Sequence, residues 1–344
     1  MSFTRVLKLI CLLLLLLPGE PALPMRVYAT GTGQIGVGVQ AGYFYDKMGR
    51  NPTPQETALF HSGLPIYHNF WPGDVALDSP DRALYFYSSS LESYPPGPPY
   101  FLREQIITNL RHYPGVARIV VFLSEPNNSG FKSQYLPPSI AAARVAEYVD
   151  FAVPLCPSCQ YFAPILAQEN VRGIDNPFDY ERRFLQALRD MGRQDVIKQI
   201  GPAYNSYQQG RSTGEWAYSI QYALRKLRAI SVEYGGRDAA VIGEFGAPFG
   251  TVGQQAATAL LIAGVLPTLR AEAVVAFYFA SPFAWEPGHG FLGRGDVFAL
   301  VGDKWTPTYI GVVLGLTGCP PLADVVARWP ATSMRDIMAA AQCQ

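Results

Sequence analysis

Two glutamates stand where apolar segments of the sequence give way to turn-forming residues. Glu125 follows the segment Arg-Ile-Val-Val-Phe-Leu-Ser and precedes Pro126, and Glu244 follows Ala-Ala-Val-Ile-Gly and precedes Phe245-Gly. Two carboxyl groups about 5–5.5 Å apart can cleave a glycosidic bond by double displacement, in which one attacks the anomeric carbon and the other exchanges a proton. Taken singly, each glutamate is as easily explained as a strand-end cap or a salt-bridge partner. Their joint placement favours a catalytic pair.

Bringing these two side chains together requires a particular order of strands. Apolar strand-like runs alternate with helical patterns along the chain, which predicts a parallel sheet with crossover helices in the α/β class. The predicted strands are Ile35–Gln40, Pro65–Asn69, Ala83–Ser88, Arg118–Ser124, Gln160–Ala167, Val196–Tyr204, Ala239–Phe245 and Ala273–Phe279. Eight strands indicate a (β/α)8 TIM barrel, whose active site lies at the carboxyl ends of its strands. Strands four and seven face each other across such a ring, so their terminal side chains can converge.

The helical segments carry apolar residues at three- and four-residue spacing. They are Thr53–Phe60, Tyr100–Tyr113, Pro138–Val149, Phe178–Met191, Ser212–Tyr234 and Val252–Leu269. Ser212-Thr-Gly-Glu215 has the pattern of a capping box at a helix start. No repeat or linker divides the chain, so we expect one catalytic barrel over residues 30–318, followed by a C-terminal helical tail over residues 319–344.

The composition and the N-terminus bound the class of protein. The 344 residues are 49% hydrophobic and 16% charged, with a net charge of zero, which predicts one large core and excludes a strongly basic nucleic-acid binder. Residues 1–29 have a positive start and the apolar run Leu9–Leu17, which is short for a membrane span of about 20 residues. They predict a signal peptide and a secreted or extracytoplasmic protein, with an N-terminal membrane anchor as the alternative.

Four cysteines remain once a signal peptide is removed. In an oxidising compartment the simplest pairing is the local disulfide Cys156–Cys159 together with Cys319–Cys343, and four free thiols are the alternative. The Cys-Pro-Ser-Cys spacing could also suggest a zinc or redox site. However, the histidines are remote in sequence, and the motif leads into a predicted strand, so a structural disulfide is the better interpretation.

The two glutamate motifs resemble those of glycoside hydrolase clan A, the (β/α)8 superfamily of retaining cellulases and mannanases. Phe122-Leu-Ser-Glu-Pro-Asn127 is similar to the clan's Asn-Glu-Pro motif after the fourth strand, and Val241-Ile-Gly-Glu-Phe-Gly246 to its nucleophile motif after the seventh. The resemblance implies a retaining glycoside hydrolase with Glu125 as acid/base and Glu244 as nucleophile, acting on an extracellular oligo- or polysaccharide. It implies no metal and no organic cofactor. Ser124 replaces the clan's usual asparagine. The alternative function is therefore a catalytically inactive barrel that binds carbohydrate or a protein partner.

Further residues are candidates for binding the sugar. The resemblance implies that Tyr204 on the sixth strand hydrogen-bonds the nucleophile, that Trp285 floors a sugar subsite, and that residues 303–309 lead into the last barrel helix. Asn127 or Asn128 would then bind the 2-hydroxyl in place of the missing asparagine. His68 and Asn69 end the second strand and are candidates for sugar hydroxyls or for a structural pair. The remaining candidates are aromatic residues near strand ends, which could stack on a sugar or pack in loops: Tyr43, Trp71, Tyr207 and Phe283.

Overall fold

A computed structural model describes nine stretches of the chain. They are residues 33–39, 67–69, 83–87, 119–129, 135–168, 173–247, 252–278, 298–301 and 304–307. The chain divides into two compact units, Met1–Gly31 and Thr32–Gln344, and every described stretch lies in the second. The predicted signal peptide and the C-terminal tail lie outside the described residues.

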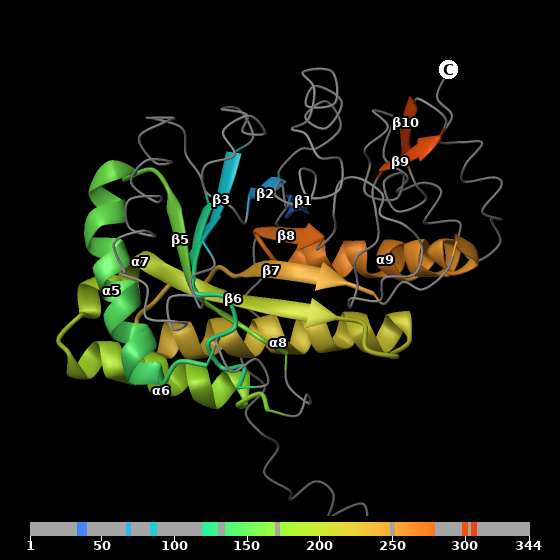
Figure 1. The fold of residues 1–344 in the computed structure, drawn as a ribbon. Coiled ribbons are helices and arrows are strands. Elements are labelled where there is room, and N and C mark those ends of the chain that lie inside the picture. Colours follow the sequence, from blue (N-terminus) through green and yellow to red (C-terminus); the bar gives the residue numbers. More distant parts are fainter. Residues whose placement is uncertain are drawn as a thin grey trace, which may run out of the picture. The chain divides into compact units, whose positions relative to one another are not determined.

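Parallel strands form the centre of the second unit (Figure 1). They are β1 (Gln34–Val39), β2 (Tyr67–Asn69), β3 (Ala83–Tyr87), β4 (Ile119–Phe122), β5 (Gln160–Leu166), β6 (Ile200–Tyr207), β7 (Val241–Gly246) and β8 (Val275–Tyr278). Each strand pairs in parallel with the next, and β8 also pairs with β1, so the pairing order closes on itself. This order brings the carboxyl ends of all these strands to the same edge of the sheet.

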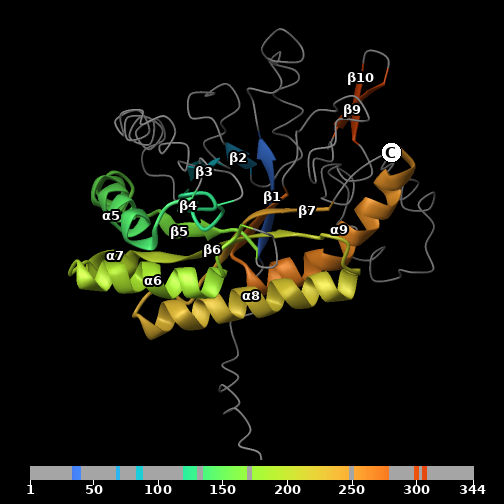
Figure 2. The same cartoon turned by 60° about the horizontal axis from the view of Figure 1, so that its bottom comes forward.

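Helices cover the outer face of the curved sheet, as Figures 1 and 2 show. They are α5 (Pro138–Leu155), α6 (Pro177–Asp190), α7 (Gln194–Gln199), α8 (Thr213–Glu233) and α9 (Val252–Glu272). The predicted capping box at the start of α8 is confirmed, because Ser212 and Glu215 each bond the other's backbone N–H. Asn176 caps α6 by accepting from the backbone N–H groups of Phe178 and Asp179. The predicted helices Thr53–Phe60 and Tyr100–Tyr113 lie outside the described residues.

The buried side chains form two clusters on opposite faces of the sheet. One contains described residues from β4–β8 and their ends, such as Val121, Ala203 and Val241, and lies on the concave side. The other joins strand residues such as Tyr204 to helix residues such as Trp216. Successive residues of a strand alternate between these faces.

The sixth strand lies further along the chain than predicted. The prediction placed it at Val196–Tyr204, whereas β6 is Ile200–Tyr207 and residues 194–199 form α7. Val196 and Ile197 are the buried side of that short helix, and their apolar character explains the error. The other described strands end within a few residues of the prediction, and α5 and α9 extend further.

Two smaller features complete the described fold. Cys156 and Cys159 form the predicted disulfide between α5 and β5, while Cys319 and Cys343 lie outside the described residues. Lys304–Pro307, which the resemblance placed at the approach to the last barrel helix, instead forms strand β10, antiparallel to β9 (Phe298–Val301). Among the described helices, none has the length and apolarity needed to cross a membrane.

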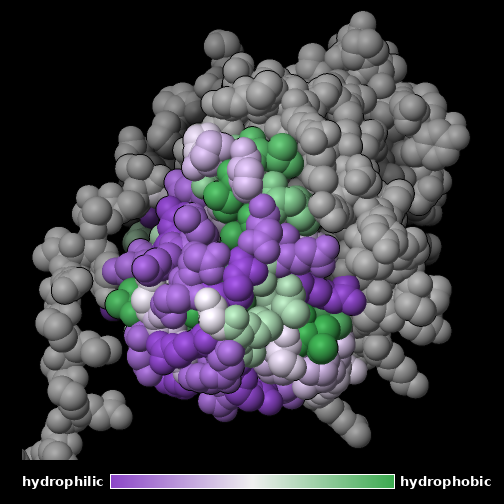
Figure 3. All heavy atoms as spheres, turned by 90° about the vertical axis from the view of Figure 1, so that its left-hand side faces the viewer, coloured by the Kyte–Doolittle hydropathy of each residue, from purple (hydrophilic) through white to green (hydrophobic). Residues whose placement is uncertain are grey.

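The side of the molecule that carries α5 and α7 is mainly hydrophilic (Figure 3). Arg193, which precedes α7, pairs with Asp195 at 3.0 Å and with Asp150 on α5. Ile140 on α5 and Met191 at the end of α6 are among the exposed apolar side chains. These helices therefore present a solvated outer face, and their apolar sides pack on the sheet.

Candidate active site

Glu244 is turned towards the concave side of the sheet by an irregularity in β7. Ile242 pairs with Tyr204 of β6, yet the next pair joins Asn205 to Glu244, so Gly243 is an extra residue in β7. The β7–β8 register shifts over the same segment. As a result Ile242 and Phe245 both belong to the helix-facing cluster, and Glu244 lies on the other side. Such a bulge re-aims a side chain without breaking the sheet.

Glu125 lies in a strained turn just beyond β4. Leu123 and Glu125 have φ angles of 57° and 49°, which non-glycine residues rarely adopt. The backbone N–H of Glu125 donates to the Ile165 carbonyl at 2.8 Å, and the Ile165 N–H donates to the Leu123 carbonyl at 2.9 Å. Ser124 is buried and forms a bridge with Ile165. The turn that carries Glu125 is therefore fixed to the end of β5.

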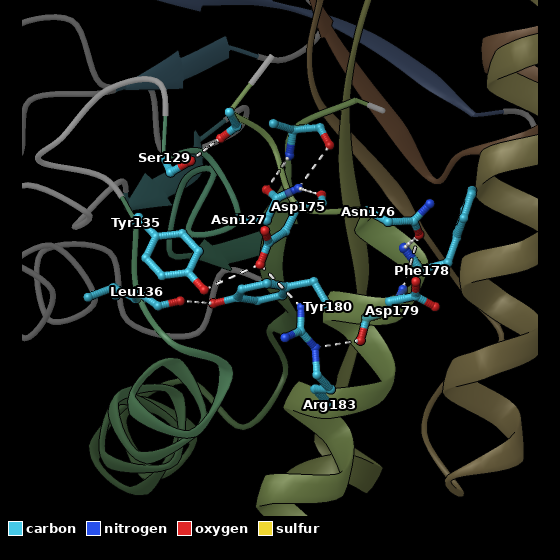
Figure 4. Close-up of polar contacts among 12 residues, drawn as sticks. Asn127, Ser129, Tyr135, Leu136, Asp175, Asn176, Phe178, Asp179, Tyr180 and Arg183 are labelled. Atoms are coloured by element: carbon cyan, nitrogen blue, oxygen red, sulfur yellow. Dashed lines mark hydrogen bonds and ion pairs between the residues drawn. The ribbon is translucent and has the colours of Figure 1, made fainter. Parts of the chain in front are cut away.

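Asn127 fastens this turn to the segment that follows β5 (Figure 4). Its Nδ2 donates to the carbonyls of Ala167 at 3.2 Å and Asp175 at 3.0 Å, and its Oδ1 accepts from the Ala167 N–H at 2.9 Å. The side chain is fully buried. Both polar atoms of its amide are engaged within the protein, so in this structure Asn127 holds the turn in place, and the binding of a sugar hydroxyl by Asn127 stays a prediction.

A second set of contacts surrounds the hydrogen bonds of Asn127, which we call the Asn127 clamp (Figure 4). Asp175 accepts from Tyr135 Oη at 3.3 Å and from Arg183 at 3.2 Å, and Tyr180 Oη donates to the Leu136 carbonyl at 2.6 Å. Burial, and then the nearby charge of Asp175, raise the pKa of Tyr135. Burial also raises the pKa of Tyr180 far above its ordinary value. Both phenols therefore stay protonated and keep donating across the usual pH range.

The carboxylate of Glu125 is held by two amides. Asn128 Nδ2 donates to Oε2 at 2.8 Å, and Asn205 Nδ2 donates to Oε1 at 2.9 Å. Asn128, which was expected at the sugar, is thus bonded to the acid/base candidate. Asn205 was not predicted as a site residue, because the predicted sixth strand ends one residue before it. Glu125 itself is half-buried.

Glu244 is held by a tyrosine of β6, but not by the expected one. Tyr207 Oη donates to Glu244 Oε2, and the Tyr207 N–H donates to Gln168 Oε1 at 2.8 Å. Tyr204 lies in the helix-facing cluster, on the opposite face of β6, so the predicted role passes to Tyr207. Strand alternation gives the reason: Ala203, Asn205 and Tyr207 share the concave face, and Tyr204 does not.

The other predicted sugar-binding residues are not described in full. Tyr43, Trp71, Phe283 and Trp285 lie outside the described residues. His68 and Asn69 lie in β2, where their backbones pair with β1 and β3 and their side chains are not described. Asn69 is the last residue of β2, so its backbone lies at the same edge of the sheet as the two glutamates.

One strand therefore holds both carboxylates. Asn205 and Tyr207 are two residues apart on β6, a separation of roughly 6.5 Å along a strand, and each bonds one of the glutamates. Glu244 is buried, with 8% of its surface exposed, whereas Glu125 is more open. A buried carboxylate and a more accessible one at the same strand edge can act as a nucleophile and a proton donor.

Several solved structures that are similar to this chain are glycoside hydrolases. A glucosidase from Croceicoccus marinus aligns with a TM-score of 0.55 and 14% identity over 84% of this chain and 66% of its own. A family 128 curdlan-specific exo-β-1,3-glucanase from Blastomyces gilchristii has a TM-score of 0.52 and 13% identity, over 83% of this chain and 99% of its own. A family 39 glycoside hydrolase from Bacteroides cellulosilyticus has a TM-score of 0.50 and 12% identity, over 82% of this chain and 62% of its own.

These likenesses define the fold of the chain. It has the fold of the clan A glycoside hydrolases, as the resemblance of its glutamate motifs implied. The chain spans less than two thirds of the length of the first and third of these structures. In sequence, no family model and no curated protein matches it. Fold alone does not fix an activity, so the reaction must be argued from the site.

Proposed function

We propose that this protein is a retaining glycoside hydrolase built on a complete (β/α)8 barrel. It cleaves O-glycosidic bonds of an extracytoplasmic oligo- or polysaccharide by double displacement. The observation that carries the proposal is that two adjacent inward residues of β6, Asn205 and Tyr207, each hydrogen-bond one of the two glutamates. The clan A fold of the chain supports it.

The environments of the two glutamates suggest their roles. Glu244 is buried beside the Tyr207 hydroxyl, whose hydrogen bond orients the carboxylate and stabilises its negative charge. In the first step it attacks the anomeric carbon while Glu125 gives a proton to the leaving oxygen. In the second step Glu125 removes a proton from water, and the water oxygen displaces Glu244. Glu125 is the more open of the two, as proton exchange with the leaving group and water requires.

The place of action is part of the proposal. The expected signal peptide directs the chain out of the cytoplasm, with an N-terminal anchor as the alternative. The Cys156–Cys159 disulfide is the bond that an oxidising compartment favours. Polysaccharide substrates occur in the same compartments.

A panel of aryl glycosides and polysaccharides tests the activity. Glu244→Gln keeps the size of the side chain and removes its nucleophilicity, so turnover should fall by roughly 10⁴-fold or more. Glu233→Gln, at the exposed end of α8, is the matched control and should retain wild-type turnover. Equal turnover by wild type and Glu244→Gln would remove Glu244 from the nucleophile role.

An inactive carbohydrate-binding barrel is the second candidate. Ser124 favours it, because serine stands where clan members have asparagine, and Ser124 is buried beside Ile165. Calorimetric titration with oligosaccharides separates the two cases. Binding without turnover, unchanged in Glu244→Gln, would support the inactive barrel, whereas turnover lost in Glu244→Gln supports the enzyme.

A further inference from the structure

Within the described part of the chain, only one of the two polar amide atoms of Asn205 has a hydrogen-bond partner. Its Nδ2 donates to Glu125 Oε1 at 2.9 Å, and the whole side chain is buried. Its Oδ1 has no hydrogen-bond partner among the described residues. A buried acceptor without a hydrogen bond costs free energy. The position of Asn205 Oδ1 beside the Glu125 carboxylate therefore requires an explanation.

The reaction itself changes what Glu125 needs from its neighbours. When ionised, both of its oxygens accept hydrogen bonds, and Asn128 and Asn205 supply them. When Glu125 is protonated, the oxygen that carries the proton becomes a donor, and an N–H group facing it is mismatched. A half-turn of the Asn205 carboxamide exchanges Nδ2 for Oδ1 with almost no change in shape. The exchange gives up no hydrogen bond of Oδ1 to the described residues.

We propose that Asn205 is a positioning residue that follows the protonation state of Glu125, an inference that rests on the proposed function. Whenever Glu125 carries the proton that it will give to the leaving oxygen, Asn205 Oδ1 turns to accept from it. When the proton moves to the leaving oxygen and Glu244 bonds to the anomeric carbon, Nδ2 turns to donate to the new carboxylate. When water loses a proton to Glu125 and its oxygen replaces Glu244, the amide turns back.

The residues around Asn205 allow the response of its amide to Glu125 to be distinguished from any response to Glu244. The titratable side chains that the described residues bring to this end of the sheet include Glu125 beyond β4, Tyr207 on β6 and Glu244 on β7. Asp175 and Tyr135 bond each other on the far side of Asn127. Tyr207 bonds Glu244 and not Glu125. From β5 comes Gln168, which is neutral and bonds the Tyr207 backbone. Replacing each glutamate in turn by glutamine therefore separates the effect of Glu125 from that of Glu244.

Leaving-group dependence tests the kinetic consequence. In Asn205→Leu, kcat/KM for a phenyl glycoside should fall roughly 10- to 100-fold, because the ionising acid loses a charge-assisted hydrogen bond. For the matching 2,4-dinitrophenyl glycoside, whose departure needs no proton, the fall should stay below about 3-fold. Ser206→Ala, on the opposite face of β6, is the control and should leave both substrates near wild type. Equal losses for both substrates, or no loss, would overturn the proposal.

Side-chain amide NMR tests the coupling without any need for activity. In protein labelled with ¹⁵N at asparagine, the Asn205 signals are assigned by their absence in Asn205→Asp. On acidification, the Asn205 amide should show a step in which it loses its hydrogen-bonded proton shift, in wild type and in Glu244→Gln. Glu125→Gln should abolish this step. Persistence of the step in Glu125→Gln, or its absence in wild type, would contradict the role of Asn205. An inactive protein that shows the step would instead disprove only the proposed function.

Discussion

At the scale of single residues, the buried side chain of Asn127 joins the turn that carries Glu125 to the segment after β5. Asn127→Ala should lower the free energy of unfolding by about 2–3 kcal/mol. The substitution leaves the Ala167 N–H and the carbonyls of Ala167 and Asp175 without their hydrogen-bond partner. Urea denaturation measures the loss. Asn176→Ala, which removes the nearby helix cap, should cost only about 1 kcal/mol.

The same substitution should also affect the turn that carries Glu125. Without the clamp, the left-handed backbone of Leu123 and Glu125 loses a support. Turnover of phenyl glycosides should fall in Asn127→Ala and remain near wild type in Asn176→Ala. Wild-type stability and turnover in Asn127→Ala would show that the Asn127 clamp neither stabilises the fold nor positions Glu125.

A second residue-scale prediction concerns Glu181 on α6, which is buried away from the site. Burial raises its pKa well above the ordinary range, and its Oε2 has no hydrogen-bond partner among the described residues. Its ionisation is easier in the unfolded chain, so stability is greatest below the unfolded pKa of about 4.3 and declines as the pH rises towards the folded pKa. Glu181→Gln cannot ionise. Its stability advantage over wild type should grow between pH 4 and pH 8, and an advantage independent of pH would show that burial does not act on ionisation.

At the scale of elements, a buried ion pair joins α8 to the end of α9. Arg228 Nη2 lies 2.6 Å from Glu272 Oε2, and both side chains are at least nine-tenths buried. Burial on its own would raise the pKa of Glu272, but hydrogen bonds from Arg225, Arg228 and Gln221 outweigh it, and the pKa is lowered. The contribution of Glu272 is therefore present above the unfolded pKa of about 4.3 and is lost as the pH falls through the folded pKa.

Breaking this pair from one side should be costly. Glu272→Leu leaves the Arg228 charge buried and should lower the free energy of unfolding by about 3–5 kcal/mol at pH 7. The double variant Arg228→Met/Glu272→Leu should recover much of this loss, since no unpaired charge remains. Thermal unfolding of both variants checks the prediction, and a double variant less stable than Glu272→Leu would contradict it.

At the scale of the whole molecule, the Cys156–Cys159 disulfide makes stability depend on an oxidising compartment. The chain-entropy model gives roughly 2 kcal/mol for a loop as short as Cys156–Cys159, so the double serine variant should lose about that much. A reductant added to this variant should destabilise it further if Cys319 and Cys343 are joined as predicted. No further loss would show that the second pair is not a disulfide.

Much of the fold was predictable from sequence, and the site was predictable in part. Apolar runs bounded by turns located β4, β5 and β7, because buried parallel strands leave that pattern. The start of β6 was misplaced because Val196 and Ile197 are apolar in a short helix as well. That error moved the expected strand end to Tyr204, so Asn205 was missed, and the tyrosine that bonds Glu244 was expected at position 204 instead of 207.

Other parts of the site left no local signal. The partners of Asn127 lie 40 and 48 residues away, and nothing near it in sequence distinguishes it from an asparagine that binds ligand. The bulge at Gly243 shows only in the register of β7 against its neighbours. Long-range pairing decided both, whereas the positions of Glu125 and Glu244 at strand ends followed from the local pattern.

The central claim is that Glu244 forms a covalent bond to the sugar. Activated 2-deoxy-2-fluoro glycosides of several sugars, each with a 2,4-dinitrophenolate leaving group, should trap that intermediate. Mass spectrometry of the intact protein should then show the addition of one fluoroglycosyl group, and peptide mapping should place it on Glu244. Glu244→Gln should remain unlabelled. A label on another residue, or hydrolysis of these sugars by wild type with inversion and no label, would contradict the account.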